Sequence, residues 1–284
     1  MTFELYNGEV KLNFNPSNHL YTVEGVKIDG VTSATGVLDK SQPLMYWAVG
    51  TAIEYLNERL KPGVSLDEVE IRTVLDEASM QHRTFKKKAA DIGTLTHDWI
   101  EEWISGKNPK SPVNPSIKNA TEAFFKWVKD HKITFISTER KVYSKKYRYA
   151  GTLDFVAVVD DKRLIVGDTK TSKGIYDDMR YQVAAYKCAL EEEIKYLLTL
   201  PEDKIKRVED LALLGAYKRL NGFDDRTIVR VGKQLNEDGA LDFEARELDE
   251  YEKDIEAFFA CLMLYRRTKQ LKGMISPMEL HTTK

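Results

Sequence analysis

Three short groups of polar residues have the types and the spacing that metal-assisted phosphate chemistry requires. They are the run Gly151-Thr152-Leu153-Asp154, the run Gly167-Asp168-Thr169-Lys170-Thr171, and the pair Gln182 and Tyr186. Carboxylates are the ligands that hard divalent cations prefer, and a lysine ammonium stabilises charge that develops on phosphate oxygens. In this order and at this spacing, the three groups predict a site for a metal ion and a phosphate.

The first two groups are expected to lie on one β-hairpin, with apolar strands rich in β-branched residues and a polar turn. The strands are residues 153–159 and 163–168, and the turn is 160–162. If Asp161 is the centre of the turn, the numbers of directly opposed residues sum to 322, as those of Asp154 and Asp168 do. Opposed side chains share a face with Cβ atoms about 5 Å apart, so the two carboxylates can hold one cation. Strand alternation adds Lys170 to the face of Asp168.

The frayed, solvated end of a strand is an alternative explanation for an isolated Asp168 and Lys170. The segment that follows favours the functional explanation. Residues 177–193 carry apolar side chains at helical spacing, and Gln182 and Tyr186 project from one face of that expected helix. A glutamine beside a tyrosine is a poor core pair, but it suits a phosphate oxygen or the orientation of Lys170.

A further polar motif lies upstream, in an amphipathic segment expected to be helical over about residues 85–105. His97 and Glu101 are four positions apart there, on the more polar side of the helix. A single histidine on such a helix is more often a structural residue than a metal ligand. The site predicted downstream is what favours the ligand interpretation for His97.

Residues 149–190 and the run from Gly93 to Glu101 resemble the PD-(D/E)XK nuclease superfamily, specifically its RecB-like exonuclease branch. Similar motifs occur in CRISPR-associated RecB-like exonucleases, in the mitochondrial genome-maintenance exonuclease and in phage exonucleases. The upstream run is similar to the G-x-x-x-H-x-x-x-E helix of that branch. The resemblance implies an α/β fold with a restriction-endonuclease-like core, in which helices flank a central mixed β-sheet. An N-terminal β-hairpin and a helical elaboration are expected to precede this core.

The same resemblance implies roles for individual residues and a cofactor. The implied metal ligands are His97, Asp154, Asp168 and the backbone carbonyl of Thr169; the implied catalytic residues are Lys170, Asp154, Asp168, Gln182 and Tyr186; and the implied accessory acidic residues are Glu101 and Glu139. The implied cofactor is Mg²⁺ or Mn²⁺. A histidine ligand shifts the preference toward Mn²⁺, because imidazole is softer than carboxylate.

The implied activity is that of a metal-dependent DNA exonuclease, which hydrolyses phosphodiester bonds in recombination, repair or end processing. Such an enzyme is typical of a bacterium or a phage. The alternative is a catalytically silent DNA-end-binding or inhibitory protein that retains the fold, and a site-specific endonuclease is a weaker third interpretation. Chemically competent residues at the signature positions favour the active enzyme. The strand preference for single- or double-stranded DNA stays open, as does a homo-oligomer or a recombination protein as partner.

The overall charge gives no general attraction to nucleic acid, since the formal net charge is −2. Local basic clusters are therefore expected to bind the DNA phosphates. The candidates are Lys86, Lys87 and Lys88, and Lys145, Lys146 and Arg148, the second cluster being interleaved with Tyr143, Tyr147 and Tyr149. These tyrosine rings are expected to stack on bases. Ordinary solvated surface is the alternative for both clusters.

The two cysteines and the hydropathy of the chain indicate a cytoplasmic protein without a membrane partner. Cys188 and Cys261 are far apart and cannot supply the four thiolates of an iron–sulfur cluster, so none is expected. Both are expected to be reduced. No apolar run approaches the roughly 20 residues that span a bilayer, and no signal peptide is recognisable.

The expected organisation has two parts within one compact domain. Residues 1–132 are expected to hold the hairpin and the helical region with the histidine motif, and residues 133–284 the nuclease core and a C-terminal helix. Helices are expected at about 31–38, 44–60, 66–78, 79–105, 115–131, 177–193 and 247–272, with strands within 8–29 and at 133–143, 151–160, 162–171, 209–219 and 226–232. The strand at 209–219 rests on the continuous apolar run from Leu211 to Tyr217, which is typical of a strand buried on both faces.

Overall fold

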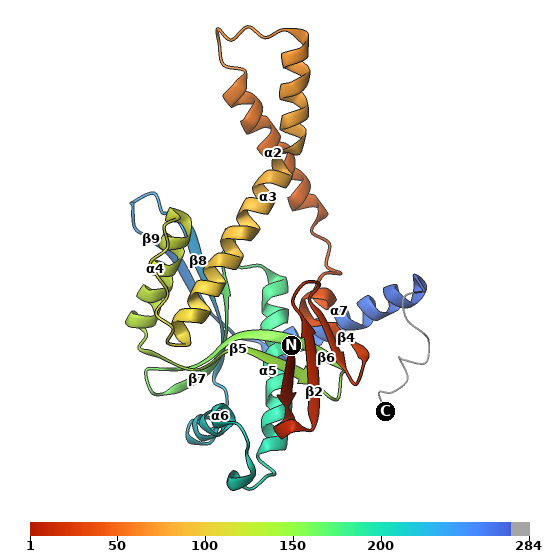
Figure 1. Cartoon of the computed structure of the whole chain (residues 1–284), viewed down its shortest axis with the longest axis vertical. Coiled ribbons are helices and arrows are strands. Elements are labelled where there is room, and N and C mark those ends of the chain that lie inside the picture. The colour runs from red at the N-terminus through yellow and green to blue at the C-terminus, as the bar shows by residue number, and fades with distance from the viewer. Residues whose placement is uncertain (274–284) are drawn as a thin grey trace. The chain divides into compact units, whose positions relative to one another are not determined.

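A mixed β-sheet of nine strands is the centre of the computed structural model, which describes residues 1–273. The strands are β1 (Thr2–Leu5), β2 (Val10–Asn15), β3 (Leu20–Val23), β4 (Val26–Gly30), β5 (Ile133–Ser144), β6 (Tyr149–Val159), β7 (Arg163–Lys170), β8 (Asp225–Leu235) and β9 (Leu241–Leu248). The helices are α1 (Val31–Thr35), α2 (Ser41–Arg59), α3 (Glu68–Ile104), α4 (Pro115–Asp130), α5 (Asp177–Leu197), α6 (Val208–Arg219) and α7 (Tyr251–Leu271). The strand order is β1-β2-β3-β4-β6-β7-β8-β9, and β5 pairs with β6 outside this path (Figure 1).

Helices cover both faces of the central strands. One apolar cluster packs α5 and α7 against Val156 and Val158 of β6, and another packs α4 against Phe155 and Ala157. The fold is therefore α/β, with a central mixed sheet flanked by helices and with antiparallel strands β1–β4 at the N-terminus. This architecture is the one expected for a restriction-endonuclease-like core.

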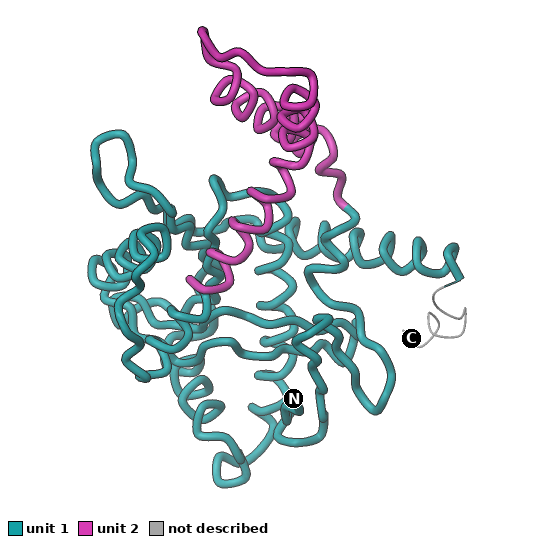
Figure 2. The backbone as a smooth tube through the Cα atoms, turned by 45° about the horizontal axis from the view of Figure 1, so that its top comes forward, with its two compact units in different colours: residues 1–37, 97–284 teal, residues 38–96 magenta. Residues whose placement is uncertain are grey.

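The chain divides into two compact units (Figure 2). Unit 1 comprises residues 1–37 and 97–284, and unit 2 comprises residues 38–96. Unit 1 contains the whole sheet, whereas unit 2 contains α2 and the larger part of α3. The boundary expected at residue 132 lies within unit 1, between α4 and β5.

The hairpin of β6 and β7 has the predicted register. Its pairs run from Phe155 with Gly167 to Val159 with Arg163, and every pair sums to 322. The turn is the predicted one, 160–162, in which Asp160 and Asp161 adopt positive φ angles. Aspartate tolerates this left-handed conformation better than most residues do, because its side chain can bond locally to the backbone.

The regular alternation of β6 is interrupted at Asp154. Tyr149 and Leu153 pack in the cluster around α5, whereas Phe155 packs in the cluster around α4. In a regular strand, residues two positions apart share a face. Opposite Asp154 on β5, Glu139 has a φ of 48°, in the left-handed region that non-glycine residues rarely adopt. The local irregularity of both strands thus coincides with two of the predicted acidic residues.

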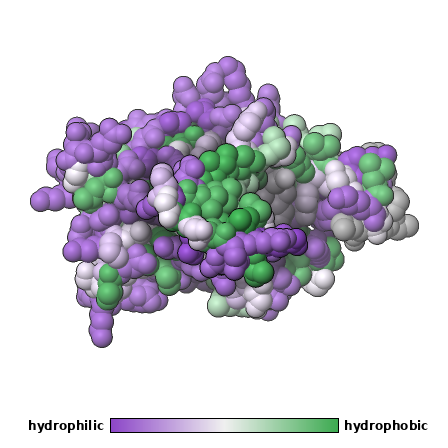
Figure 3. Space-filling model, turned by 90° about the horizontal axis from the view of Figure 1, so that it is seen from above, coloured by the Kyte–Doolittle hydropathy of each residue, from purple (hydrophilic) through white to green (hydrophobic). Residues whose placement is uncertain are grey.

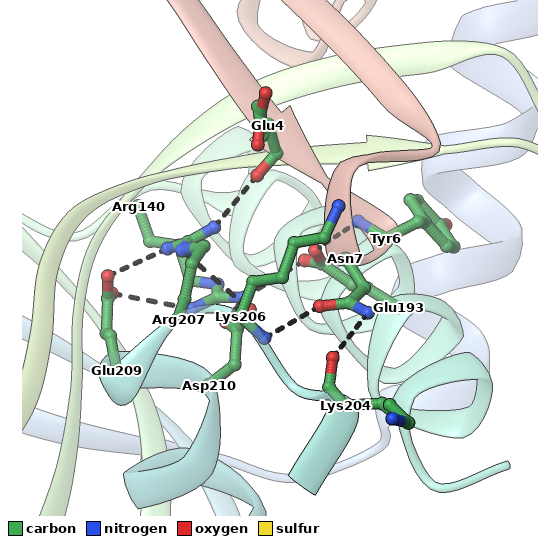
Figure 4. Close-up of polar contacts among 10 residues, drawn as sticks. All are labelled: Glu4, Tyr6, Asn7, Arg140, Glu193, Lys204, Lys206, Arg207, Glu209 and Asp210. Atoms are coloured by element: carbon green, nitrogen blue, oxygen red, sulfur yellow. Dashed lines mark hydrogen bonds and ion pairs between the residues drawn. The ribbon is translucent and has the colours of Figure 1, made fainter. Parts of the chain in front are cut away.

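A buried polar cluster ties the N-terminal strands to α5 and α6 (Figure 4). Arg140 of β5 is 3% exposed and pairs with Glu193 at 3.1 Å and with Asp210 at 2.7 Å. The backbone amide of Tyr6 donates to the other oxygen of Glu193 at 2.8 Å. One buried guanidinium therefore links a strand, two helices and the segment after β1.

The strand expected at 209–219 was wrong, because this segment is the helix α6. Its apolar run from Leu211 to Tyr217 contains no β-branched residue and consists mainly of leucine and alanine, which favour helices. Asp210, Leu213 and Leu214 are buried, at helical spacing. The length of the apolar run was misleading, since only one side of it is buried.

The other differences concern element boundaries. α3 is one helix over the range for which two were expected, β9 was not expected, and α7 begins at Tyr251 rather than at residue 247. Among residues 1–273, none of the helices combines the length and the apolar character required to cross a bilayer.

Candidate functional site

The open end of the β6–β7 hairpin brings Asp154 next to the predicted Asp-x-Lys segment. Beyond the last strand pair, the backbone amide of Thr169 donates to Oδ2 of Asp154 at 2.7 Å. Asp168 is 1% exposed, and the side chain of Asp154 is 17% exposed. Two carboxyl groups with little access to water therefore lie in one small region.

Lys170 forms an ion pair with Asp168 through Nζ and Oδ2. The two residues are two positions apart on β7, so the predicted placement on one face is observed. Burial alone would lower the pKa of Lys170, but the carboxylates of Asp168 and Asp154 outweigh it and raise this pKa above its ordinary value. The ammonium therefore keeps its proton and its charge at neutral pH.

His97, on α3, lies within unit 1 and contacts Asp154, with Nδ1 3.5 Å from Oδ2. Burial, and then the positive charge of Lys170, lower the pKa of His97. The imidazole is thus held neutral, which is the form that binds metal ions. Glu101, one helical turn later, helps to raise the pKa of Glu139 and so belongs to the same group of charges.

The pKa values of the Glu139 and Asp154 carboxyl groups are both raised well above their ordinary values. Burial, followed by the charge of Asp154, raises the pKa of Glu139 to about 7. Burial, followed by the charge of Asp168, raises the pKa of Asp154 to about 7, although Lys170 and the Thr169 amide oppose this. Neighbouring carboxyl groups that are shielded from water resist ionising together, and a bound cation relieves that resistance.

Gln182 projects from α5 into a polar contact with two other residues. Its Nε2 donates to Oγ1 of Thr35 at 3.2 Å and to Oδ2 of Asp178 at 3.4 Å. Asp178 is buried, and its charge helps to raise the pKa of Lys170. Neither Thr35 nor Asp178 was predicted. Asp178 could have been found from its position four residues before Gln182, on the same face of the helix.

Tyr186, one helical turn after Gln182, is buried over Gly151. A Cβ atom at Gly151 would lie 2.5 Å from the tyrosine ring, so only glycine fits beneath it. Burial, and then the charges of Asp168 and Asp154, raise the pKa of Tyr186 far above its ordinary value. The phenol therefore stays protonated beside the two carboxyl groups.

Lys141 is a second lysine beside the carboxyl groups, and its place in the site was not predicted from the sequence. Its Nζ lies 3.4 Å from Oε2 of Glu139, and 5.3 and 5.4 Å from the ring centroids of Phe3 and Phe14. Its position two residues after Glu139 is a signal in the sequence, because such residues share a strand face. The aromatic neighbours come from β1 and β2 and could not be read from local spacing.

The basic cluster Lys86, Lys87 and Lys88 is exposed on the part of α3 that belongs to unit 2. The second cluster lies at the turn between β5 and β6. Lys145 is already partnered there, with Nζ 2.8 Å from Oε2 of Glu9 and over the rings of Tyr6 and Tyr196. Lys146 lies over the ring of Tyr147. Arg148 also has a partner within the described residues.

The tyrosines interleaved with this second cluster are not available for stacking on bases as a group. Tyr149 is fully buried, and its hydroxyl donates to the backbone carbonyl of Ala185 at 2.8 Å. Tyr143 is also buried, and Tyr147 packs against Phe259. The expectation of base stacking was wrong for Tyr143 and Tyr149, because their rings complete the hydrophobic core.

The site contains donor atoms of the kinds that bind metal ions. Within the described chain, no three His, Cys, Asp or Glu side chains converge on one position suited to a metal. The contacts are pairwise, between His97 and Asp154 and between Lys170 and Asp168. The types of donor nevertheless fit a divalent cation: the buried carboxylate of Asp168, the largely buried carboxylate of Asp154 and the neutral imidazole of His97.

Known proteins show only a weak similarity to this chain. No family model and no curated protein sequence matches the chain. Among solved structures, the crystal structure of an alkaline exonuclease from Laribacter hongkongensis aligns with 83% of this chain and 100% of that chain, at 13% identity and a TM-score of 0.24. A TM-score this low does not indicate a shared fold or function.

Proposed function

We propose that this chain is a divalent-metal-dependent nuclease that hydrolyses phosphodiester bonds in DNA. The observation that carries the proposal is the grouping of the buried Asp168 with Asp154 and Lys170, whose side chains are only 17% and 22% exposed, together with the neutral His97 that contacts Asp154. Burying charged groups is costly, and hydrophobic residues of similar size often stabilise a fold better. Buried titratable groups with shifted pKa values are concentrated at catalytic and binding sites, so this cluster favours a functional role over a purely structural one.

The residues that would hold the ion are His97, Asp154, Asp168 and the backbone carbonyl of Thr169. When bound, Mg²⁺ or Mn²⁺ would neutralise phosphate charge and lower the pKa of a water molecule. Asp154 is oriented for this role by the amide of Thr169. His97 contributes its neutral nitrogen without having to lose a proton first.

Lys170 would bind a non-bridging phosphate oxygen. Negative charge on that oxygen grows in the transition state, so an ammonium fixed beside it lowers the barrier to hydrolysis. The protonated phenol of Tyr186 can donate to the same phosphate or to a carboxylate. Gln182, held by Thr35 and Asp178, would orient these groups from α5.

Action at DNA ends, in recombination, repair or end processing, is the finer part of the proposal. It is tested with an end-labelled linear duplex, an end-labelled single strand and a covalently closed circle, each with Mg²⁺, Mn²⁺ or EDTA. We expect the linear DNA to be degraded from its ends with metal, EDTA to stop the reaction, and the circle to stay intact. An Asp168→Asn variant purified in the same way controls for contaminating nuclease.

The other outcomes separate the alternatives. Cleavage of the circle would indicate an endonuclease. Binding of DNA ends without cleavage under any of the metal conditions would contradict the enzyme and support a catalytically silent end-binding protein. A wild-type rate equal to that of the Asp168→Asn control would also contradict the proposal.

A further inference from the structure

Unit 2 has a small core for a helical unit of its length. Its buried residues are Thr51, Val74, Ala78, Ile92 and Thr96. Large apolar side chains are exposed along both of its helices, and hydrophobic surface of this kind is visible as a patch in the space-filling view (Figure 3). Isolated helices are marginally stable in water without a packed apolar face, so unit 2 needs a further contact.

Apolar residues of α2, together with Leu60 directly after it, form a stripe along one side of the helix. The seam of this α2 stripe is Met45, Val49, Ala52 and Leu56, and Ile53 and Leu60 lie beside it. The seam residues are four, three and four positions apart, which is the spacing of helices that pair along their length. Met45, Val49, Ile53 and Leu60 are 57%, 53%, 51% and 49% exposed. Thr51, which is buried, lies on the opposite side of the helix.

We infer that the α2 stripe binds the α2 stripe of a second copy of this chain, as an antiparallel helix pair around a two-fold axis. The order of residues along the stripe is self-complementary. An axis between Ala52 and Ile53 sets Met45 against the partner's Leu60 and Val49 against the partner's Leu56. A symmetric dimer requires this property, because the same patch must serve both copies.

Charge and area favour a second copy as the occupant. The α2 stripe contains no Asp, Glu, Lys or Arg, so two identical stripes do not repel each other, and DNA phosphates find no basic partner on it. Because only about six residues of each copy take part, against the roughly 20–30 a side of a standard interface, the interface is expected to lie near the lower limit of about 1,000 Å². The dimer is therefore expected to be reversible and concentration-dependent.

Sedimentation of the full chain over a range of concentrations tests this inference. We expect wild-type protein to pass from one chain to two, and the double variant Val49→Glu with Ile53→Glu to stay monomeric, because it would bury four carboxylates in the interface. Val208→Glu is the matched control: Val208 is 81% exposed on α6 of unit 1, and the variant should dimerise as wild type does. A wild-type chain that stays monomeric up to about 100 μM, a hundred times a micromolar Kd, would overturn the inference. A dimer that the double variant retains would overturn it as well.

Disulfide cross-linking tests the register even if the glutamate variant fails to fold. Met45→Cys combined with Leu60→Cys should form covalent dimers on mild oxidation. Met45→Cys combined with Glu54→Cys should not, because Glu54 lies off the stripe. The wild-type chain, which contains Cys188 and Cys261, provides the background. Equal cross-linking of the two variants would contradict the antiparallel arrangement.

Discussion

The backbone amide of Thr169 donates a hydrogen bond to Oδ2 of Asp154, 2.7 Å away, across the open end of the β6–β7 hairpin. Asp168 and Lys170, the two neighbours of Thr169, are thereby held beside Asp154. An amide donor favours the charged form of a carboxyl group, so this bond opposes the burial that raises the pKa of Asp154. A single backbone contact thus positions one predicted ligand and favours its charged form.

Replacing Lys170 should remove catalysis while leaving metal binding intact. Lys170→Ala is expected to reduce the single-turnover cleavage rate by about 10²–10³, the usual loss for one electrostatic donor that acts in the transition state. Lys162→Ala is the matched control, since Lys162 is exposed in the turn of the same hairpin. A Lys170→Ala rate near that of the control would contradict the proposed role.

Metal binding should stabilise the protein through the two aspartates. At a free Mn²⁺ concentration of 100 times Kd, the free energy of unfolding is expected to rise by about 2.7 kcal/mol, provided that the ion binds only the folded chain. Thermal unfolding with and without Mn²⁺ measures this gain. Asp154→Asn and Asp168→Asn should lose it, whereas Asp161→Asn, in the exposed turn, should keep it. Equal shifts in Tm for all three variants would exclude this site.

The hairpin could be predicted because the residues that determine its register are close together in the sequence. Its register depends on a three-residue turn and on apolar runs directly beside it, so the pairs from Phe155 with Gly167 to Val159 with Arg163 could be matched by number alone. The contact between Lys170 and Asp168 follows from strand alternation, and the common face of Gln182 and Tyr186 follows from helical spacing. Each of these relationships lies within one element or one turn.

The remaining features depend on contacts between distant segments. Arg140 meets Glu193 and Asp210, which are 53 and 70 positions away in the sequence. The change of face at Asp154 coincides with the left-handed backbone of Glu139, on another strand. The periodicity of apolar residues within one helix or strand cannot predict contacts between distant segments. The wrong prediction at α6 has a different cause: a continuous apolar run suggests a buried strand, although its leucine and alanine residues favour a helix.

Gly167 should be intolerant of a side chain. A Cβ atom at this position would lie 2.0 Å from the ring of Phe155, which is itself fully buried between strands and helices. Gly167→Ala is therefore expected to lower the free energy of unfolding by about 1–3 kcal/mol, the usual cost of overpacking a core. Urea unfolding provides the measurement.

Gly215→Ala is the control for that substitution and tests α6 as well. Nothing lies within 4 Å of a Cβ atom at Gly215, in the interior of α6. The variant should be neutral or up to about 1 kcal/mol more stable, because alanine favours a helix more than glycine does. Loss of stability at Gly215 equal to that at Gly167 would contradict both assignments.

Arg140 should be among the most sensitive positions in the chain. Arg140→Met would leave Glu193 and Asp210 buried without their shared guanidinium, which is expected to cost about 3–5 kcal/mol of unfolding free energy. Arg246→Met is the control, because Arg246 pairs with Glu244 on the surface and should change stability by less than about 1 kcal/mol. Adding Glu193→Gln and Asp210→Asn to Arg140→Met should recover part of the loss, since the uncompensated charges are removed. If the triple variant is less stable than Arg140→Met alone, the loss comes from the missing hydrogen bonds rather than from buried charge.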